Sequence, residues 1–341
     1  MFYPWTTVVG FFIGAAIGSF LNVVVYRLPR GMSLIAPPSH CPACGHRLGV
    51  LDLVPILSYV ASGGKCRHCK GRVSARYVVI ELITGSLWAA FWWQNLVEGE
   101  DVARFLVLSA FASVLVAASA IDLATYTIPI GLNALLLLFG LGYNAWLIVA
   151  GADGAWAHLG SLALPASVAG ALVGVAVFWG IAFFGRLAFR KDAMGHGDIM
   201  LARGLGAVLF PATALVGFGL AVLVAVVFGV LQVFLRRPPE TVEESEGEGE
   251  EEPPETVSSL VRSGLGYALA IDVVGIVFPS LDRWWFGQEL VEEPLEDDWT
   301  PGFTHIPFGP YLAAGAILAA LFDRTLLGWV QSYWNWATGG P

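Results

Sequence analysis

The sequence predicts an all-α polytopic membrane protein with about eight transmembrane helices and a small cytoplasmic four-cysteine zinc-binding domain after the first helix. Three observations support this fold class. The chain is 56% hydrophobic with a mean hydropathy of +0.69, and only 13% of its residues are charged, against about 25% in an average protein. Apolar runs of about 20 residues, the length that crosses a bilayer, recur along most of the chain. Four cysteines form two Cys-x-x-Cys pairs, a spacing that favours metal over disulfides.

Residues 1–26 are expected to form the first transmembrane helix. No basic segment precedes its apolar run and no small-residue cleavage site follows it, so we expect a retained span rather than a cleaved signal peptide. Residues 27–76 are polar, basic and rich in Pro and Gly, and they are expected to form the extramembrane domain. The positive-inside rule places this domain in the cytoplasm and the N-terminus outside.

Residues 77–237 are expected to contain transmembrane helices 2–7. The fifth span is expected at about 159–184, and Pro211 separates a short sixth span from the seventh. Counting crossings from the cytoplasmic domain also places the basic loops at 186–191 and 236–237 in the cytoplasm. A missed span would put one of these loops on the other side, so their agreement supports the topology.

Residues 238–304 interrupt this pattern and are expected to form an acidic cytoplasmic insertion that is partly disordered. The run 240–255 is rich in Glu, Pro and Gly and cannot bury a core. The apolar stretch 263–279 is short and contains Asp272, which favours a re-entrant or interfacial helix over a ninth span. Residues 305–341 are expected to supply transmembrane helix 8 and a short tail.

Two aspartates on apolar segments are the candidate catalytic residues. Asp198 follows Gly195 and Gly197 at the start of the sixth span, and Asp122 ends the third. Charged side chains within membrane spans are costly and usually functional, while glycines leave room for a substrate or another backbone. The topology puts both acids at the cytoplasmic face. Two carboxylates in one site can share one proton, so that one activates water while the other protonates a carbonyl oxygen. The alternative is that each acid is an interfacial cap.

The two cysteine pairs are the candidate metal ligands: Cys41, Cys44, Cys66 and Cys69. Two such knuckles suit a tetrahedral zinc site with no open position, and the metal would fold a domain that has little core of its own. A role of this domain in binding a second substrate is the weaker alternative.

Three further polar residues are supporting candidates. Glu81 in the second span and Asn22 in the first need partners within the membrane, so each either lines the active cavity or forms a structural bond between helices. His196, between the two glycines, is a candidate for hydrogen bonding to the acids.

At this point the chain resembles the type IV prepilin peptidases, GxGD-type intramembrane aspartic proteases that are bifunctional prepilin leader peptidase/N-methyltransferases of the bacterial inner membrane. The resemblance covers nearly the whole chain outside the acidic insertion. Besides the two aspartates, it rests on the motifs at 18–29, 55–59, 76–85 and 307–311.

This resemblance implies removal of a short basic leader from prepilins or pseudopilins on the cytoplasmic side, with Asp122 and Asp198 as the catalytic pair. It also implies N-methylation of the new N-terminal residue with S-adenosyl-L-methionine as donor, whose binding residues the sequence does not identify. Expected partners are the prepilin or pseudopilin substrates, the lipid bilayer and pilus or type II secretion assembly proteins, and no nucleic acid is expected.

The sequence departs from the family pattern in three places. Met200 stands where the family often has lysine, and Ile130 where it tends to have an acid. The acidic insertion is not a usual family feature, and one hypothesis is that it attracts basic leaders or a pilus-assembly partner. Two alternative functions stay open: a peptidase-only member with a purely structural zinc domain, and a non-catalytic membrane scaffold of the same fold.

Overall fold

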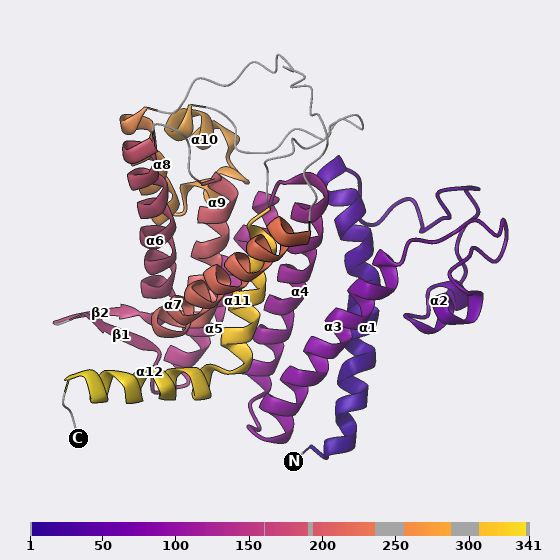
Figure 1. The fold of residues 1–341 in the computed structure, drawn as a ribbon, viewed down its shortest axis with the longest axis horizontal. Coiled ribbons are helices and arrows are strands. Elements are labelled where there is room, and N and C mark those ends of the chain that lie inside the picture. The colour runs from indigo at the N-terminus through magenta and orange to yellow at the C-terminus, as the bar shows by residue number, and fades with distance from the viewer. Residues whose placement is uncertain (1, 160, 190–193, 236–255, 288–306, 339–341) are drawn as a thin grey trace. The chain divides into compact units, whose positions relative to one another are not determined.

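The computed structural model describes residues 2–159, 161–189, 194–235, 256–287 and 307–338, and these residues are mostly helical (Figure 1). The chain divides into two compact units. Unit 1 comprises Met1–Tyr143 and Glu292–Pro310, and unit 2 comprises Asn144–Val291 and Tyr311–Pro341.

Unit 1 is a group of long apolar helices with a largely irregular cysteine domain inserted after the first. Its elements are a 3₁₀ turn (Pro4–Thr6), α1 (Thr7–Arg27), 3₁₀ turns at Leu28–Arg30 and Val50–Asp52, α2 (Leu57–Ser62), α3 (Arg76–Trp92), a π-helical turn (Trp93–Val97), α4 (Val102–Thr125) and the first part of α5 (Ile130–Val149).

Helices α1 and α3 pack closely because α1 presents glycines at four-residue spacing to α3. A Cβ on Gly10 would lie 2.9 Å from Trp92 Cβ, and one on Gly18 would lie 2.8 Å from Glu81 Cα. Gly14, midway between them, faces Trp88 just as closely. Small residues at this spacing allow two helix backbones to approach within a membrane. Hydropathy does not indicate which helices pair, whereas this glycine face allows α1 and α3 to pack closely.

Unit 2 contains the remaining helices and the only β-hairpin in the described residues. Its elements are the end of α5, β1 (Trp156–Leu159), β2 (Leu162–Pro165), α6 (Ala166–Phe189), α7 (His196–Leu235), α8 (Val257–Ala268), α9 (Ile271–Gly275), α10 (Pro279–Phe286), most of α11 (Gly309–Leu321) and α12 (Asp323–Thr338).

The hairpin corrects the expected start of the fifth span. Helix α6 begins at Ala166 rather than near residue 159, because Leu162–Pro165 pairs antiparallel with Trp156–Leu159. The side chain of Asn144 fixes this junction: its Nδ2 donates to the Ala155 carbonyl at 3.2 Å, and its Oδ1 accepts from the Ser167 N–H at 2.8 Å. An apolar run alone does not distinguish a strand of this kind from the first turn of a helix.

Helix α7 is two helices joined at a break. Phe210 has φ 63° and ψ 167°, directly before Pro211, and a proline disfavours the helical conformation at the residue before it. Figure 1 shows the two halves of α7 running in different directions. The first half packs on α6 through Gly170 and Gly206, where each glycine meets the backbone carbonyl of the other. The break expected from Pro211 is therefore present.

Five helices in the described residues are long and apolar enough to cross a membrane: those within Pro4–Arg30, Val102–Thr125, Ile130–Val149, Ala166–Phe189 and His196–Leu231. A sixth crossing is counted if Gly309–Leu321 and Thr325–Ser332, bent by 86°, form one span. Helix α3 has 17 residues, about 26 Å of helix against a hydrocarbon core of about 30 Å. An eight-span count requires α3, α11 and both halves of α7 to cross, and it stays a proposal.

Residues 256–287, inside the expected insertion, fold as three short helices. Helix α8 lies against α6, where Trp179 Nε1 donates to the Leu260 carbonyl at 2.7 Å. Helices α9 and α10 have five and eight residues, far below the length of a membrane span. The acidic run 240–255, which the sequence predicts to be disordered, lies outside the described residues.

Candidate active site and metal centre

Asp122 lies near the end of α4 and is buried, with 4% of its surface exposed. Its carbonyl accepts the Tyr126 N–H at 2.8 Å, and Tyr126 adopts a left-handed conformation that ends the helix. Its carboxylate Oδ2 accepts the backbone N–H of Gly309 at 2.9 Å. Gly309 is the first residue of α11, so the acid lies at a helix N-terminus, where backbone N–H groups and the helix dipole favour negative charge.

Gly309 is a site residue that pattern reasoning about the acids alone does not find. A Cβ at this position would lie 2.5 Å from Asp122 Oδ2 and 3.1 Å from Ile128 Cδ1. Only a glycine therefore brings its N–H onto the carboxylate without displacing it. The available signal was the Pro307–Phe308–Gly309–Pro310 sequence, which suggested the family but gave no role for its glycine.

Asp198 lies in the first turn of α7 and is half-buried. Its N–H donates to the Gly195 carbonyl at 3.2 Å, so the acid sits just inside the N-terminus of a helix, a position that stabilises an anion. A Cβ on Gly195 would meet Asp198 Oδ2 at 3.7 Å, an ordinary contact. The described residues thus leave space at Gly195, and use of that space by a substrate stays a prediction, as does any such role for Gly197.

The two aspartates belong to different units, Asp122 to unit 1 and Asp198 to unit 2. Their sharing of one site stays a prediction. His196, two residues before Asp198, does have a defined partner: its Nδ1 lies 2.8 Å from the hydroxyl oxygen of Tyr267 in α8.

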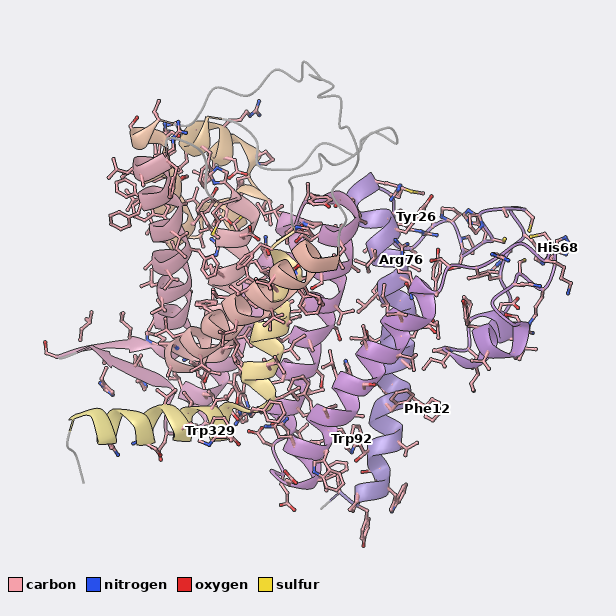
Figure 2. All side chains as sticks on the ribbon, viewed as in Figure 1. Phe12, Tyr26, His68, Arg76, Trp92 and Trp329 are labelled. Atoms are coloured by element: carbon pink, nitrogen blue, oxygen red, sulfur yellow. The ribbon has the colours of Figure 1, made fainter. Side chains whose placement is uncertain are left out.

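The structure brings the four cysteines together, as the sequence predicts. The ligand atoms of Cys41, Cys44, Cys66 and Cys69 all lie within 4.8 Å of one another. The domain that holds them leaves the end of α1 and returns at the start of α3, beside Tyr26 and Arg76 in Figure 2. Arg27, at the end of α1, holds the first residues of this domain: its guanidinium donates to the carbonyls of Ser33 at 2.8 Å and Pro37 at 2.6 Å.

The two cysteine pairs are held by equivalent backbone turns. Four residues after the first cysteine of each pair, Gly45 and Lys70 adopt left-handed conformations and donate to the carbonyls of Cys41 and Cys66 at 2.8 and 3.0 Å. Backbone hydrogen bonds from Cys69 and His68 lower the pKa of the Cys66 thiol to about 7. At Cys66 the local fold thus favours a thiolate, which is the form that binds metal. Despite a backbone hydrogen bond from His46, burial and the neighbouring thiols of Cys69 and Cys41 raise the pKa of the Cys44 thiol to about 11.

The donor set fits a zinc ion. Four sulfur ligands at about 2.3 Å from a tetrahedral metal lie about 3.8 Å from one another, and the sulfurs of Cys41 and Cys69 are 3.9 Å apart. The rings of His46 and His68 stack on each other, with centroids 4.3 Å apart. Neither belongs to the ligand cluster. A zinc ion here would join the two knuckles and stabilise the fold of the domain.

Glu81 and Asn22 both tie elements of unit 1 together. Asn22 Nδ2 donates to the carbonyl of Tyr77 at 3.1 Å, joining α1 to α3. Glu81 Oε2 accepts the N–H of Ile56 at 2.7 Å, joining α3 to the cysteine domain. Ile56 has a positive φ of 63°, an uncommon conformation for a β-branched residue. The sequence left two roles open for each residue: lining the active cavity or forming a structural bond. The structure shows the structural bonds, and a place for either residue in the active cavity stays a proposal.

Comparisons with known proteins cover most of the chain. Residues 12–95 match the model of the bacterial peptidase A24 N-terminal domain, and residues 109–230, which include both aspartates, match that of the type IV leader peptidase family. A prepilin leader peptidase/N-methyltransferase of Myxococcus xanthus is 32% identical over 93% of this chain and 90% of its own length. One of Burkholderia pseudomallei is 31% identical over 91% of this chain and 83% of its own length. No solved structure matches the chain.

The long apolar helices and the clustered cysteines define a multi-pass membrane protein with a small four-cysteine domain. Together with the matches, they establish the family: the chain belongs to the type IV leader peptidase family, whose relatives carry the name prepilin leader peptidase/N-methyltransferase. The resemblance inferred from the sequence motifs is thereby confirmed.

The metal centre gives a direct prediction. The purified protein is expected to carry close to one zinc ion per chain, and Cys66→Ser is expected to lose it and to open residues 38–73 to protease, because three thiolates leave a tetrahedral zinc site incomplete. His68→Ala, which changes the same turn without removing a ligand, serves as control and keeps its zinc. Metal analysis and limited proteolysis measure both effects. Equal zinc content in the two variants would contradict the assignment.

Proposed function

We propose that this protein is a membrane aspartic endopeptidase that removes the short basic leader of type IV prepilins or pseudopilins on the cytoplasmic side, and that it N-methylates the new N-terminal residue. The observation that carries the proposal is the similarity of nearly the whole chain to prepilin leader peptidase/N-methyltransferases, 32% over 93% of its length for one of them. The similarity includes the segments that hold both aspartates and all four cysteines.

In the proposed mechanism Asp122 and Asp198 form one catalytic pair. One carboxylate takes a proton from water, which attacks the scissile carbonyl, while the other gives its proton to the carbonyl oxygen. The amide nitrogen then receives a proton as the bond breaks. Asp122 is buried in an apolar helix with a Gly309 N–H on one oxygen, and Asp198 lies in the first turn of another helix. Placing a carboxylate within an apolar helix costs free energy, and two such carboxylates support a function for both.

The proposed topology puts both acids at the cytoplasmic face of a bacterial inner membrane. It has eight spans with the N-terminus outside, and the basic segments lie in the cytoplasm by the positive-inside rule. The leader of a prepilin precedes an apolar segment, so a protease that cuts it needs its acids at the membrane surface rather than at the midplane. Pilus or type II secretion assembly proteins are further proposed partners.

In the second proposed reaction, the amine freed by cleavage takes a methyl group from S-adenosyl-L-methionine. The amine nitrogen forms the new bond to carbon as the bond between that carbon and sulfur breaks, and the amine loses a proton. No described residue identifies the donor site. The four-cysteine domain is the proposed structural zinc centre, and the Glu81 bond to Ile56 joins it to α3.

Replacing either catalytic candidate tests the peptidase directly. Asp122→Asn and Asp198→Asn are each expected to lower prepilin cleavage by about a hundredfold to ten-thousandfold, since an amide cannot transfer the proton. Asp153→Asn, at an exposed loop position, serves as control and retains cleavage. Cleavage of a purified prepilin in detergent or liposomes is followed by gel shift and mass spectrometry. Full activity in either catalytic variant would end the aspartic mechanism.

Methyl transfer separates the bifunctional enzyme from a peptidase-only relative. Incubation with a prepilin and S-adenosyl-L-methionine labelled on its methyl group is expected to give a cleaved product that carries the label at its N-terminus. The Asp198→Asn variant, given a precleaved pilin, tells whether methylation needs the acid. A cleaved product without label would support the peptidase-only alternative, and neither cleavage nor label would favour a non-catalytic scaffold.

A further inference from the structure

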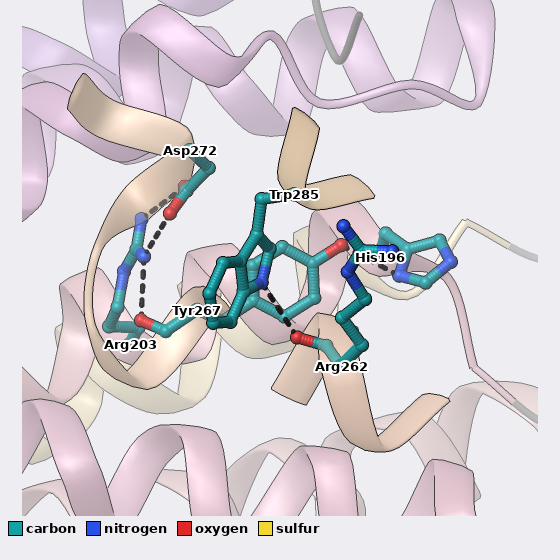
Figure 3. Close-up of polar contacts among 6 residues, drawn as sticks. All are labelled: His196, Arg203, Arg262, Tyr267, Asp272 and Trp285. Carbon is teal, nitrogen blue, oxygen red and sulfur yellow. Dashed lines mark hydrogen bonds and ion pairs between the residues drawn. The ribbon is translucent and has the colours of Figure 1, made fainter. Parts of the chain in front are cut away.

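Two residues, Tyr267 of α8 and Asp272 of α9, bond to the first two turns of α7, the helix that carries Asp198. Tyr267, which is 1% exposed, places its hydroxyl 2.8 Å from Nδ1 of His196. Its backbone carbonyl accepts from Arg203 Nη1 at 2.9 Å. Tyr267 therefore contacts α7 on both sides of Asp198, once before the acid and once after it. Figure 3 shows Tyr267 between His196 and Arg203.

An ion pair buried from solvent holds the second of these contacts. Arg203 Nη1 and Nη2 each lie 2.6 Å from an oxygen of Asp272, and the two residues are 1% and 0% exposed. Such a pair adds little net stability over apolar residues, but it strongly disfavours any arrangement that separates its charges. The Arg203–Asp272 pair therefore fixes the register of α8 and α9 against α7.

The contact between Tyr267 and His196 lies in a segment whose backbone has unusual conformational freedom. His196 stands between Gly195 and Gly197, and glycine allows more backbone conformations than any other residue. A bond from His196 to a helix that is itself held elsewhere limits that freedom. Asp198 follows two residues later, with its N–H on the Gly195 carbonyl, so the conformation of this turn determines where the carboxylate lies.

Helix α8 does not need the Tyr267 hydroxyl to stay in place. It is fixed to α6 by the bond from Trp179 to Leu260 and by Gly264, which lies directly against the Trp179 ring. Trp285 Nε1 and Arg262 add further bonds between α8 and α10. The hydroxyl thus holds the His196 turn, while other contacts hold the helix.

We propose that Tyr267 is a positioning residue for peptide cleavage: acting through His196, it holds the turn before α7 so that Asp198 is in place for the reaction. This inference rests on the proposed function. The hydroxyl touches His196 rather than the acid, so its removal changes the geometry of the reacting group and leaves substrate binding largely intact. Displacement of a catalytic group by about 1 Å is enough to slow a reaction by up to about a hundredfold.

The test compares Tyr267→Phe, which keeps the ring, with Ser263→Ala, which removes a buried hydroxyl bonded within α8 to the Leu260 carbonyl. In Tyr267→Phe, kcat for prepilin cleavage is expected to fall about tenfold with KM within about twofold, the pattern of a misplaced catalytic group. Its melting temperature and zinc content stay those of the wild type, while hydrogen exchange of the 194–200 backbone rises. Ser263→Ala is expected to match the wild type in all five measurements.

A second comparison tests the route through His196. His196→Ala and Tyr267→Phe break the same bond, so the double variant is expected to be no slower than the slower single one. His196→Asn, whose amide reaches the position of Nδ1, is expected to retain more kcat than His196→Ala. This advantage disappears in the Tyr267→Phe background.

The outcomes separate the inference from the proposed function. Unchanged kcat and unchanged exchange in Tyr267→Phe, with a wild type that cleaves prepilin, would overturn the inference alone. Equal losses of kcat and of melting temperature in Tyr267→Phe and Ser263→Ala would also overturn it, because they would show a structural role. A wild type that cleaves no prepilin would contradict the proposed function, and the inference falls with it.

Discussion

The structure depends on one constraint: a polar group buried among apolar helices needs a partner close by, because no water replaces a missing one. Asp122 has the N–H of Gly309, Glu81 has that of Ile56, and Arg203 has Asp272. Each of these bonds joins segments that are distant in the sequence. Polar groups that are expensive to bury thus determine which apolar elements meet, and in this chain several of them lie at or beside the candidate catalytic residues.

Glycines make these pairings sterically possible. Gly309 lets a backbone N–H reach the Asp122 carboxylate, and a Cβ there would lie 2.5 Å from the acceptor. Gly18 brings α1 against the backbone of Glu81, and Gly170 and Gly206 bring α6 against the helix that begins with the Asp198 turn. Close helix packing and the placement of the acids therefore have a common origin in small residues at contact points.

The sequence predicted the helical membrane class, the break at Pro211 and the clustering of the cysteines, because hydropathy, proline and ligand spacing are local signals. It placed the start of the fifth span too early, because the apolar residues directly before Ala166 form a β-strand. This strand pairs with Trp156–Leu159, and hydropathy alone does not indicate that pairing. It likewise gave no role to Gly309, Tyr267 or Arg203, whose partners lie 64 to 187 residues away along the chain. Asp272 was seen as an anomaly in an apolar stretch, and its explanation is an arginine in another helix.

The central claim is that Asp122 and Asp198 share one reaction site, and short-range crosslinking tests it most directly. Asp122→Cys and Asp198→Cys are introduced together, treated in membranes with the shortest bifunctional thiol reagent, and mapped by mass spectrometry of the bridged peptides. Thr125→Cys with Thr127→Cys, whose hydroxyl oxygens lie 3.0 Å apart within unit 1, is the positive control. The account predicts a bridge between the two catalytic positions in a yield comparable to the control. A bridged control with no bridge between positions 122 and 198 would contradict it.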